Sequence, residues 1–83
     1  MTGSSKASTI QGFKLESFTV PVGTTVTWTN KDSAPHTVTA ENSSFMSPTL
    51  NQGSTFTFTF TKAGTYGYFC ALHAGMTGTV TVQ

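Results

Sequence analysis

Three residues with metal-binding side chains stand close together in the C-terminal part of the chain, in the spacing Cys70-x-x-His73-x-x-Met76. Cys70 is the only cysteine, and His73 is one of two histidines. A thiolate, an imidazole and a thioether are all donors to soft metal ions. Taken singly, a buried cysteine is more often a small apolar side chain, and a methionine more often fills a core. Their joint spacing therefore predicts a metal site.

The second histidine, His36, can complete a four-ligand set. It follows Pro35, which biases the residue before it toward extended geometry, so His36 stands at the entrance of an expected strand. Two imidazoles and one thiolate with a weakly bound methionine form the set that suits copper electron-transfer sites. We therefore expect His36, Cys70, His73 and Met76 to bind one copper ion.

Two other chemistries use the same residue types. A cysteine hydrolase would pair Cys70 with His36 or His73 and would need an asparagine or an aspartate, such as Asp32, to orient the base. The chain has only 83 residues and suggests no substrate pocket, which argues against this hypothesis. A structural zinc site would use more cysteine or histidine, because a thioether is a poor zinc ligand. Adventitious zinc binding stays open.

The composition limits other classes of function. Only 8% of the residues are charged, the net charge is +1, and arginine is absent. Such a chain lacks the dense basic face that binds a phosphate backbone, so we expect no nucleic-acid partner. No apolar run approaches the roughly 20 residues of a membrane span, and the polar start does not resemble a signal peptide.

Alternating polar and apolar residues run through much of the chain. The clearest stretches are 25–30, with Val26 and Trp28 on one face, and 54–61, where phenylalanines alternate with threonines. Further strands are expected within 9–15, 18–22, 37–40, 65–70 and 77–82, and no helical period is present. The pattern predicts an all-β, antiparallel β-sandwich of about seven short strands.

The first residues do not share this alternation. Residues 1–8 are small and polar, and we expect them to form a disordered or cloning-derived tail before a single domain at 9–83. Within that domain we expect Ile10, Phe13 and Leu15 to be buried and Trp28 to anchor the core. Residues 41–53 have no sustained period and are expected to form a connection.

Four motifs in this order resemble those of the cupredoxin superfamily of small blue copper proteins, in its plastocyanin and amicyanin branch. They read VGTTVTWTN at 22–30, APHTV at 34–38, AGTYGYFCALHAGM at 63–76 and GTV at 78–80. The short gap between His73 and Met76 is the amicyanin-like form. Thr37 stands where this branch commonly has asparagine.

The resemblance implies a Greek-key sandwich. It also implies a one-electron carrier, not an enzyme, whose type 1 copper cycles between Cu(II) and Cu(I). It implies His36, Cys70 and His73 as the close ligands and Met76 as the long axial one. The residues implied around the site are Pro35, Thr37 and Leu72. The backbone N–H groups of Thr37 and Leu72 are expected to reach toward the Cys70 sulfur.

The resemblance also implies an electron donor and an electron acceptor that dock transiently around His73. The expected docking patch consists of Pro35, Leu72, His73, Ala74 and Gly75. We expect a monomer in the periplasm or another extracytoplasmic compartment. Two alternatives stay open: a copper delivery or storage protein, and a cupredoxin module of a larger copper oxidoreductase.

Overall fold

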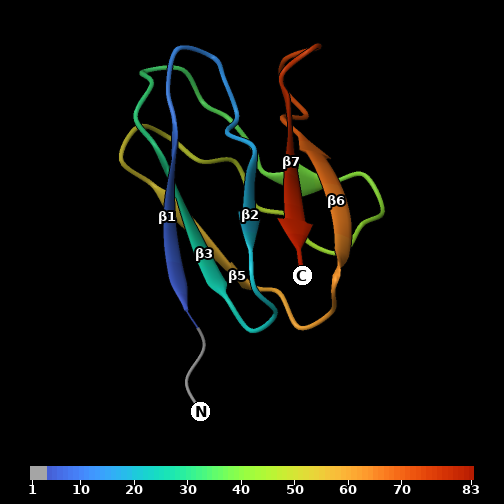
Figure 1. The fold of residues 1–83 in the computed structure, drawn as a ribbon. Helices are drawn as coiled ribbons and strands as arrows, with labels where there is room; N and C mark the ends of the chain where they lie inside the picture. The colour runs from blue at the N-terminus through green and yellow to red at the C-terminus, as the bar shows by residue number, and fades with distance from the viewer. Residues whose placement is uncertain (1–3) are drawn as a thin grey trace.

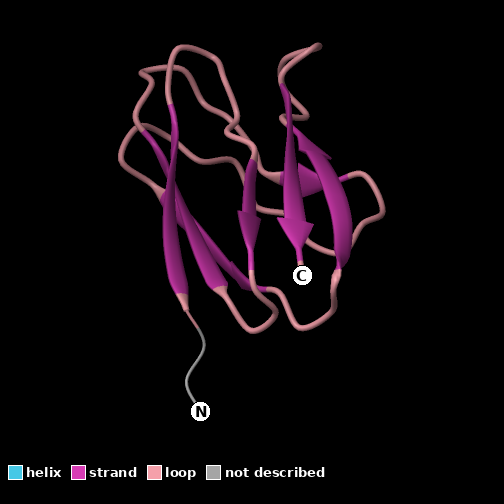
Figure 2. Ribbon diagram, in the orientation of Figure 1, coloured by secondary structure: helices cyan, strands magenta, loops and turns pink. Residues whose placement is uncertain are grey.

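The computed structural model describes residues 4–83, and their strands form two packed sheets (Figure 1). The first sheet has the order β1-β3-β5, which are Ser5–Ile10, Thr25–Asn30 and Thr55–Thr59. The second has the order β2-β7-β6-β4, which are Phe18–Val20, Thr77–Val82, Gly64–Phe69 and Thr39–Ala40. Residues 4–83 contain no helix, and hence none with the length and apolar character of a membrane span (Figure 2). The expected all-β sandwich of seven strands is confirmed.

The expected antiparallel arrangement is wrong for two of the strand pairs. β1 pairs in parallel with β3, from Ser5 opposite Thr25 to Ile10 opposite Asn30, and β2 pairs in parallel with β7. The route of the chain explains the first pair, because β2 runs back along the other sheet before β3 begins (Figure 1). The pairs β3 with β5, β4 with β6 and β6 with β7 are antiparallel.

The first strand begins earlier than expected. Ser5–Ser8 belong to β1 and not to a tail, whereas residues 1–3 lie outside the described part of the chain. Backbone pairing needs no apolar side chain, which is why the alternation does not reveal this strand. Ser8 is buried, and its hydroxyl donates to Glu16 Oε1 at 2.6 Å. The Lys6 ammonium lies 5.2 Å above the ring centre of Phe18, which ties β1 to the second sheet.

Trp28 anchors the core between the sheets, as expected. Its ring centre lies 5.6 Å from those of Phe45 and Tyr68 and 6.0 Å from that of Phe56. The indole N–H donates to Tyr68 Oη at 3.2 Å, and the Tyr68 hydroxyl donates to the carbonyl of Glu16. Burial raises the pKa of Tyr68 to about 12. The hydroxyl therefore keeps its proton and holds β6 to the segment before β2.

The loops that follow β1, β3 and β6 gather at one end of the sandwich, opposite the N-terminus (Figure 1). His36 lies in the loop after β3 and exchanges two backbone hydrogen bonds with Leu50, of 3.0 and 2.7 Å. Leu50 and Phe45 are buried, so the irregular connection at 41–53 is fixed to the core at both residues. The sandwich thus delivers a histidine from one loop beside a cysteine from another.

Candidate metal centre

Cys70 stands directly after β6, at the start of the short loop to β7. Its side chain is buried, and its N–H donates to the carbonyl of Met76 at 3.0 Å. The His73 N–H approaches the Cys70 carbonyl at 3.4 Å, which tightens the turn. Gly75 completes the turn with a φ of 80°, a conformation that glycine adopts without a steric penalty. The loop is therefore closed by its own backbone.

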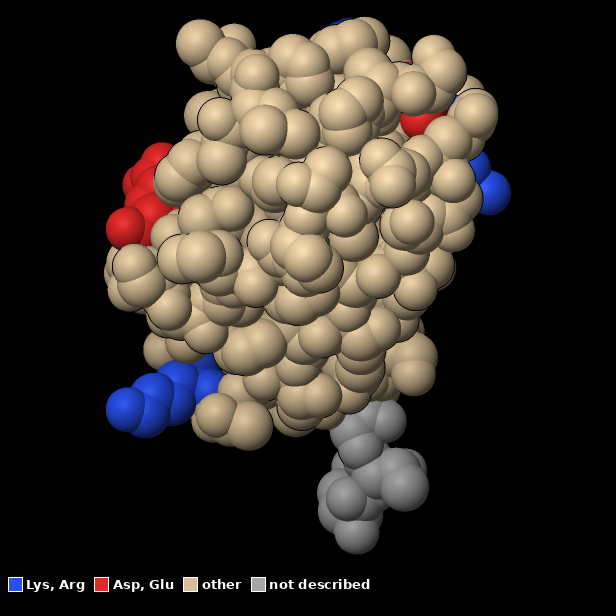
Figure 3. All heavy atoms as spheres, turned by 180° about the vertical axis from the view of Figure 1, so that it is seen from behind, with Lys and Arg blue, Asp and Glu red and all other residues tan. Residues whose placement is uncertain are grey.

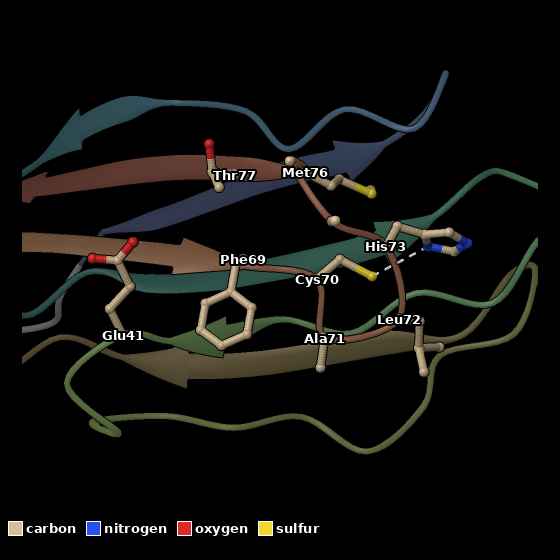
Figure 4. Close-up of a pocket in the computed structure, with 10 residues that line it drawn as sticks. Glu41, Phe69, Cys70, Ala71, Leu72, His73, Met76 and Thr77 are labelled. Carbon is tan, nitrogen blue, oxygen red and sulfur yellow. Dashed lines mark hydrogen bonds between the residues drawn. The ribbon is translucent and has the colours of Figure 1, made fainter.

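Three donor atoms meet at the inner side of this loop. Cys70 Sγ and one ring nitrogen each of His36 and His73 all lie within 4.8 Å of one another. The sulfur is 3.7 Å from Nδ1 of His36 and 3.6 Å from Nδ1 of His73, the pair joined by the dashed line in Figure 4. An ion bound by three coplanar donors at about 2.0–2.3 Å keeps them about 3.5–4.0 Å apart. The three residues therefore fit around one metal ion.

Met76 lies at the edge of this group, directly before β7. Its side chain is buried, at 5% exposure. Figure 4 shows its sulfur on the same side of the loop as the Cys70 sulfur and the His73 ring. The structure thus brings Cys70 and His73 together with His36 from the loop after β3, and it places the Met76 side chain beside them, on the same side of the loop.

Thr37 connects the two loops that carry these residues. Its backbone N–H donates to Cys70 Sγ at 3.3 Å, and its Oγ1 accepts from the N–H of Ala71 at 2.7 Å. The same hydroxyl lies 3.2 Å from Thr39 Oγ1. Within residues 4–83 the N–H of Leu72 makes no hydrogen bond to the sulfur, and the Leu72 side chain is 48% exposed. The sulfur therefore has one backbone donor, from Thr37.

Asp32, which the sequence suggests only as the orienting residue of a hydrolase, contacts a residue of the metal centre. Its Oδ2 lies 2.8 Å from Nε2 of His36, which is fully buried. Because an ionised carboxylate only accepts hydrogen bonds, the Nε2–H of His36 is the donor, which leaves the lone pair of Nδ1 facing the sulfur. The N–H of Phe13 lowers the pKa of Asp32 most, burial opposes this, and the N–H of Gly12 and the His36 ring lower it further. Asp32 is therefore a carboxylate at neutral pH.

Cys70, His36 and Asp32 contact one another in the order of a hydrolase triad, but the surroundings do not suit hydrolysis. The thiol is 2% exposed, and a second imidazole, from His73, lies equally close to it. So buried a sulfur, shared by two imidazoles, is poorly placed to attack a substrate carbonyl. The hollow of about 510 Å³ beside the loop is lined by Glu41, Phe69 and Thr77 together with the loop residues 70–76. The donors are arranged for an ion and not for an acyl group.

Phe13 is not in the core, contrary to the expectation from its position after Ile10. It is 50% exposed, and its ring meets the rings of His36 and His73 edge to face, with both centroid distances at 4.9 Å. β1 ends at Ile10, and Gly12 and Phe13 take left-handed φ angles of 66° and 56°. This turn breaks the alternation and carries the ring to the metal centre.

The residues of the expected docking patch lie around His73 at this end of the sandwich. His73 itself is partly buried. The other members are exposed: Pro35, Leu72, Ala74 and Gly75. None of the five side chains carries a fixed charge, so the patch itself is uncharged.

Comparison with known proteins gives one consistent result. The model of the family described as "copper binding proteins, plastocyanin/azurin family" matches residues 2–83. The chain is 39% identical over 84 residues to plastocyanin of Scenedesmus fuscus, covering 86% of each. It is 38% identical over 69 residues to amicyanin of Paracoccus denitrificans, covering 77% of this chain and 53% of that protein.

The solved structures agree with the family match. A structure described as a novel purple cupredoxin from Nitrosopumilus maritimus is similar with a TM-score of 0.83 and 35% identity, covering 94% of this chain and 99% of that one. The oxidised structure of an amicyanin variant gives a TM-score of 0.85 at 32% identity, covering 96% and 83%. With a family match that reaches from residue 2 to the last residue, the chain belongs to the plastocyanin/azurin family of copper-binding proteins.

Proposed function

We propose that the protein is a one-electron carrier with a single type 1 copper ion. His36, Cys70 and His73 are the close ligands, and Met76 is the weak fourth ligand. Bound copper supplies the chemistry by cycling between Cu(II) and Cu(I). The observation that supports this proposal best is the convergence of Nδ1 of His36 and Nδ1 of His73 on Cys70 Sγ, at 3.7 and 3.6 Å.

The protein's own groups orient the sulfur and keep the cage rigid. The Thr37 N–H donates to Cys70 Sγ at 3.3 Å, and such a hydrogen bond to a ligand atom fixes its position. His36 comes from the loop after β3 and Cys70 from the end of β6, so each sheet holds one side of the site. Both side chains are buried in close-packed surroundings, which resist displacement. Such a cage changes little during electron transfer.

Redox partners reach the site through the docking patch. Its members are Pro35, Leu72, His73, Ala74 and Gly75, of which His73 is the ligand and therefore the shortest path to the metal. A donor and an acceptor use this patch in turn, and the protein works as a monomer. The family resemblance supports a periplasmic or other extracytoplasmic location.

Copper titration of the apoprotein tests the proposal. One equivalent of Cu(II) is expected to produce intense visible absorption, because a thiolate ligand transfers charge to Cu(II). Cys70→Ser removes the thiolate and is expected to abolish the band. Met46→Leu is a matched control, since Met46 is 64% exposed and lies outside the site, and it is expected to leave the band unchanged. A colourless parent protein that binds copper would overturn the proposal.

Electrochemistry separates electron transfer from copper delivery. A carrier is expected to give a reversible one-electron wave on an electrode and to retain its copper in both oxidation states. A delivery protein would instead release Cu(I) to a competing chelator within the time of the measurement. Release of this kind would favour the copper delivery alternative.

A further inference from the structure

The segment between β1 and β2 crosses the metal centre in a conformation that its sequence does not favour. Gly12 and Phe13 are consecutive left-handed residues, with φ angles of 66° and 56°. Glycine takes this conformation freely, but a residue with a Cβ does so at a cost of about 1–2 kcal/mol. Phe13 is also half exposed, so burial of its side chain does not account for its position. Another interaction must hold the turn.

That interaction is with the carboxylate of Asp32. Its Oδ1 accepts from the Gly12 N–H at 2.8 Å, and its Oδ2 accepts from the Phe13 N–H at 2.9 Å. Successive N–H groups of a turn form a concave site for an anion, and bonds to a charged acceptor are among the stronger ones. The Asp32 backbone is fixed in turn, because its N–H donates to Oδ1 of the buried Asn30 at 2.9 Å.

The same carboxylate reaches the metal ligand. Oδ2 lies 2.8 Å from Nε2 of His36, and the carboxylate is thus shared by the turn and the ligand. The His36 ring needs this partner, because it is fully buried and an unpaired ring N–H would be costly. With the proton fixed on Nε2, the lone pair of Nδ1 is directed to the side of Cys70 Sγ.

The ring of Phe13 covers the two histidines. Its centroid is 4.9 Å from each imidazole at angles of 88° and 83°, and the imidazoles are themselves 4.9 Å apart. Edge-to-face contacts of this kind are favourable and directional. The three rings therefore form one aromatic cluster, whose outer member is Phe13 at the molecular surface.

We propose that Asp32 forms a clasp and Phe13 forms a lid for the metal centre. This proposal rests on the function proposed above. Asp32 is a positioning residue that fixes the tautomer of His36 and seats the turn at residues 12 and 13. Phe13 is the lid, and its ring excludes water and small ligands from the space between His36 and His73. An aromatic ring thereby forms part of the surface that a redox partner meets at this end.

Hydrogen exchange and ring-nitrogen NMR of the apoprotein test the clasp without any metal. In Asp32→Asn the amide nitrogen of the new side chain cannot accept, so the three donors compete for one oxygen. We expect the Gly12 and Phe13 amides to exchange at least tenfold faster than in the parent, and the His36 ring to lose its single Nε2–H tautomer. Unchanged exchange at both amides in a folded Asp32→Asn protein would overturn the clasp.

The lid is tested with Phe13→Gly, which suits the left-handed backbone and leaves the Asp32 hydrogen bonds available. Added imidazole is expected to perturb the visible spectrum of the Co(II)-loaded variant at concentrations at least tenfold lower than in the parent. Val22→Ala is the matched control, because Val22 is a similarly exposed apolar residue, at 47%, that hydrogen-bonds at the opposite end of the sandwich. Equal sensitivity to imidazole in Phe13→Gly and the parent would overturn the lid.

These outcomes are separate from those of the copper titration. A parent protein without a blue band would refute the proposed function, whereas the apoprotein amides report on the clasp regardless of colour. A blue parent with freely exchanging Gly12 and Phe13 amides would refute the clasp and leave the electron carrier intact.

Discussion

Thr37 shows how one small side chain joins two loops of the metal centre. Its hydroxyl accepts from the Ala71 N–H at 2.7 Å, so the loop after β3 is bound to the loop after β6. Thr37 stands where its branch of the family commonly has asparagine, and a hydroxyl is shorter than an amide. The shorter side chain can still accept from the Ala71 N–H because the two backbones lie close together. The bond from the Thr37 N–H to Cys70 Sγ, at 3.3 Å, demonstrates this.

Removal of this hydroxyl gives the first prediction. Thr37→Val keeps the branched shape but removes the acceptor of the part-buried hydrogen bond from the Ala71 N–H. We expect the free energy of unfolding of the apoprotein to fall by about 0.5–1.5 kcal/mol, the net contribution of a typical hydrogen bond. Urea unfolding measures this change. Thr37→Ser restores the hydroxyl and is expected to retain more of the stability, and equal losses in the two variants would contradict the role of the bond.

At the scale of residues, the sequence predicts the metal-binding side chains better than it predicts the residues that hold them in position. Cys70, His73 and Met76 are close in the chain, so their type and spacing alone indicate a site, and His36 is the only other imidazole. Phe13 could not be placed in the same way. Apolar residues after a strand are expected to continue inward, and a left-handed phenylalanine depends on an acceptor 19 residues away.

At the scale of elements, β1 is the strand with the weakest sequence signal and a clear structural role. It covers one edge of β3 along its whole length, from Thr25 to Asn30. Without β1, the backbone donors and acceptors at that edge of β3 would be exposed to solvent and would hydrogen-bond to water. Its end also leads directly into the turn that carries Phe13, so β1 sets the starting point of the proposed lid.

Removal of residues 1–8 is therefore expected to destabilise the protein. The truncated chain loses the ladder between Ser5–Ser8 and Thr25–Trp28, at about 0.5–1.5 kcal/mol for each net hydrogen bond. Thermal or urea unfolding should show a loss of several such bonds. Lys6→Ala removes only the contact with Phe18 and is expected to cost less than about 1 kcal/mol. A truncated protein as stable as the parent would restore the interpretation of residues 1–8 as a tail.

The alternation of polar and apolar residues predicts where strands lie, but not which strands pair or in which direction they run. It identified β3 and β5 because tryptophan, valine and phenylalanine alternate there with threonine, and the structure pairs Trp28 with Phe56 and Val26 with Phe58. Alternation has the same period in parallel and antiparallel strands. The direction of β1 and β2 therefore depends on the order in which the chain visits the two sheets, which local sequence does not encode.

At the scale of the whole molecule, charge is sparse and dispersed. The chain has four lysines and three acidic residues, for a net charge of +1. Figure 3 shows a face of the molecule that is almost entirely uncharged, with its few acidic and basic side chains near the rim. One of the three carboxylates, that of Asp32, is already paired with His36 and backbone N–H groups. Long-range attraction can therefore contribute little to the encounter with a partner.

Electron self-exchange provides the test of this conclusion. The polypeptide has a net charge of only +1 before a metal is bound, and the docking patch is uncharged, so two molecules should repel each other weakly. We expect the self-exchange rate, measured by NMR line broadening in mixtures of Cu(I) and Cu(II) protein, to change less than about threefold between about 0.02 and 0.2 M salt. Leu72→Lys adds a charge to the patch on each molecule, so its rate should be lower and should rise with salt. A strong salt dependence in the parent would mean that the molecules meet through another, charged surface, because an apolar contact around His73 has no charges to screen.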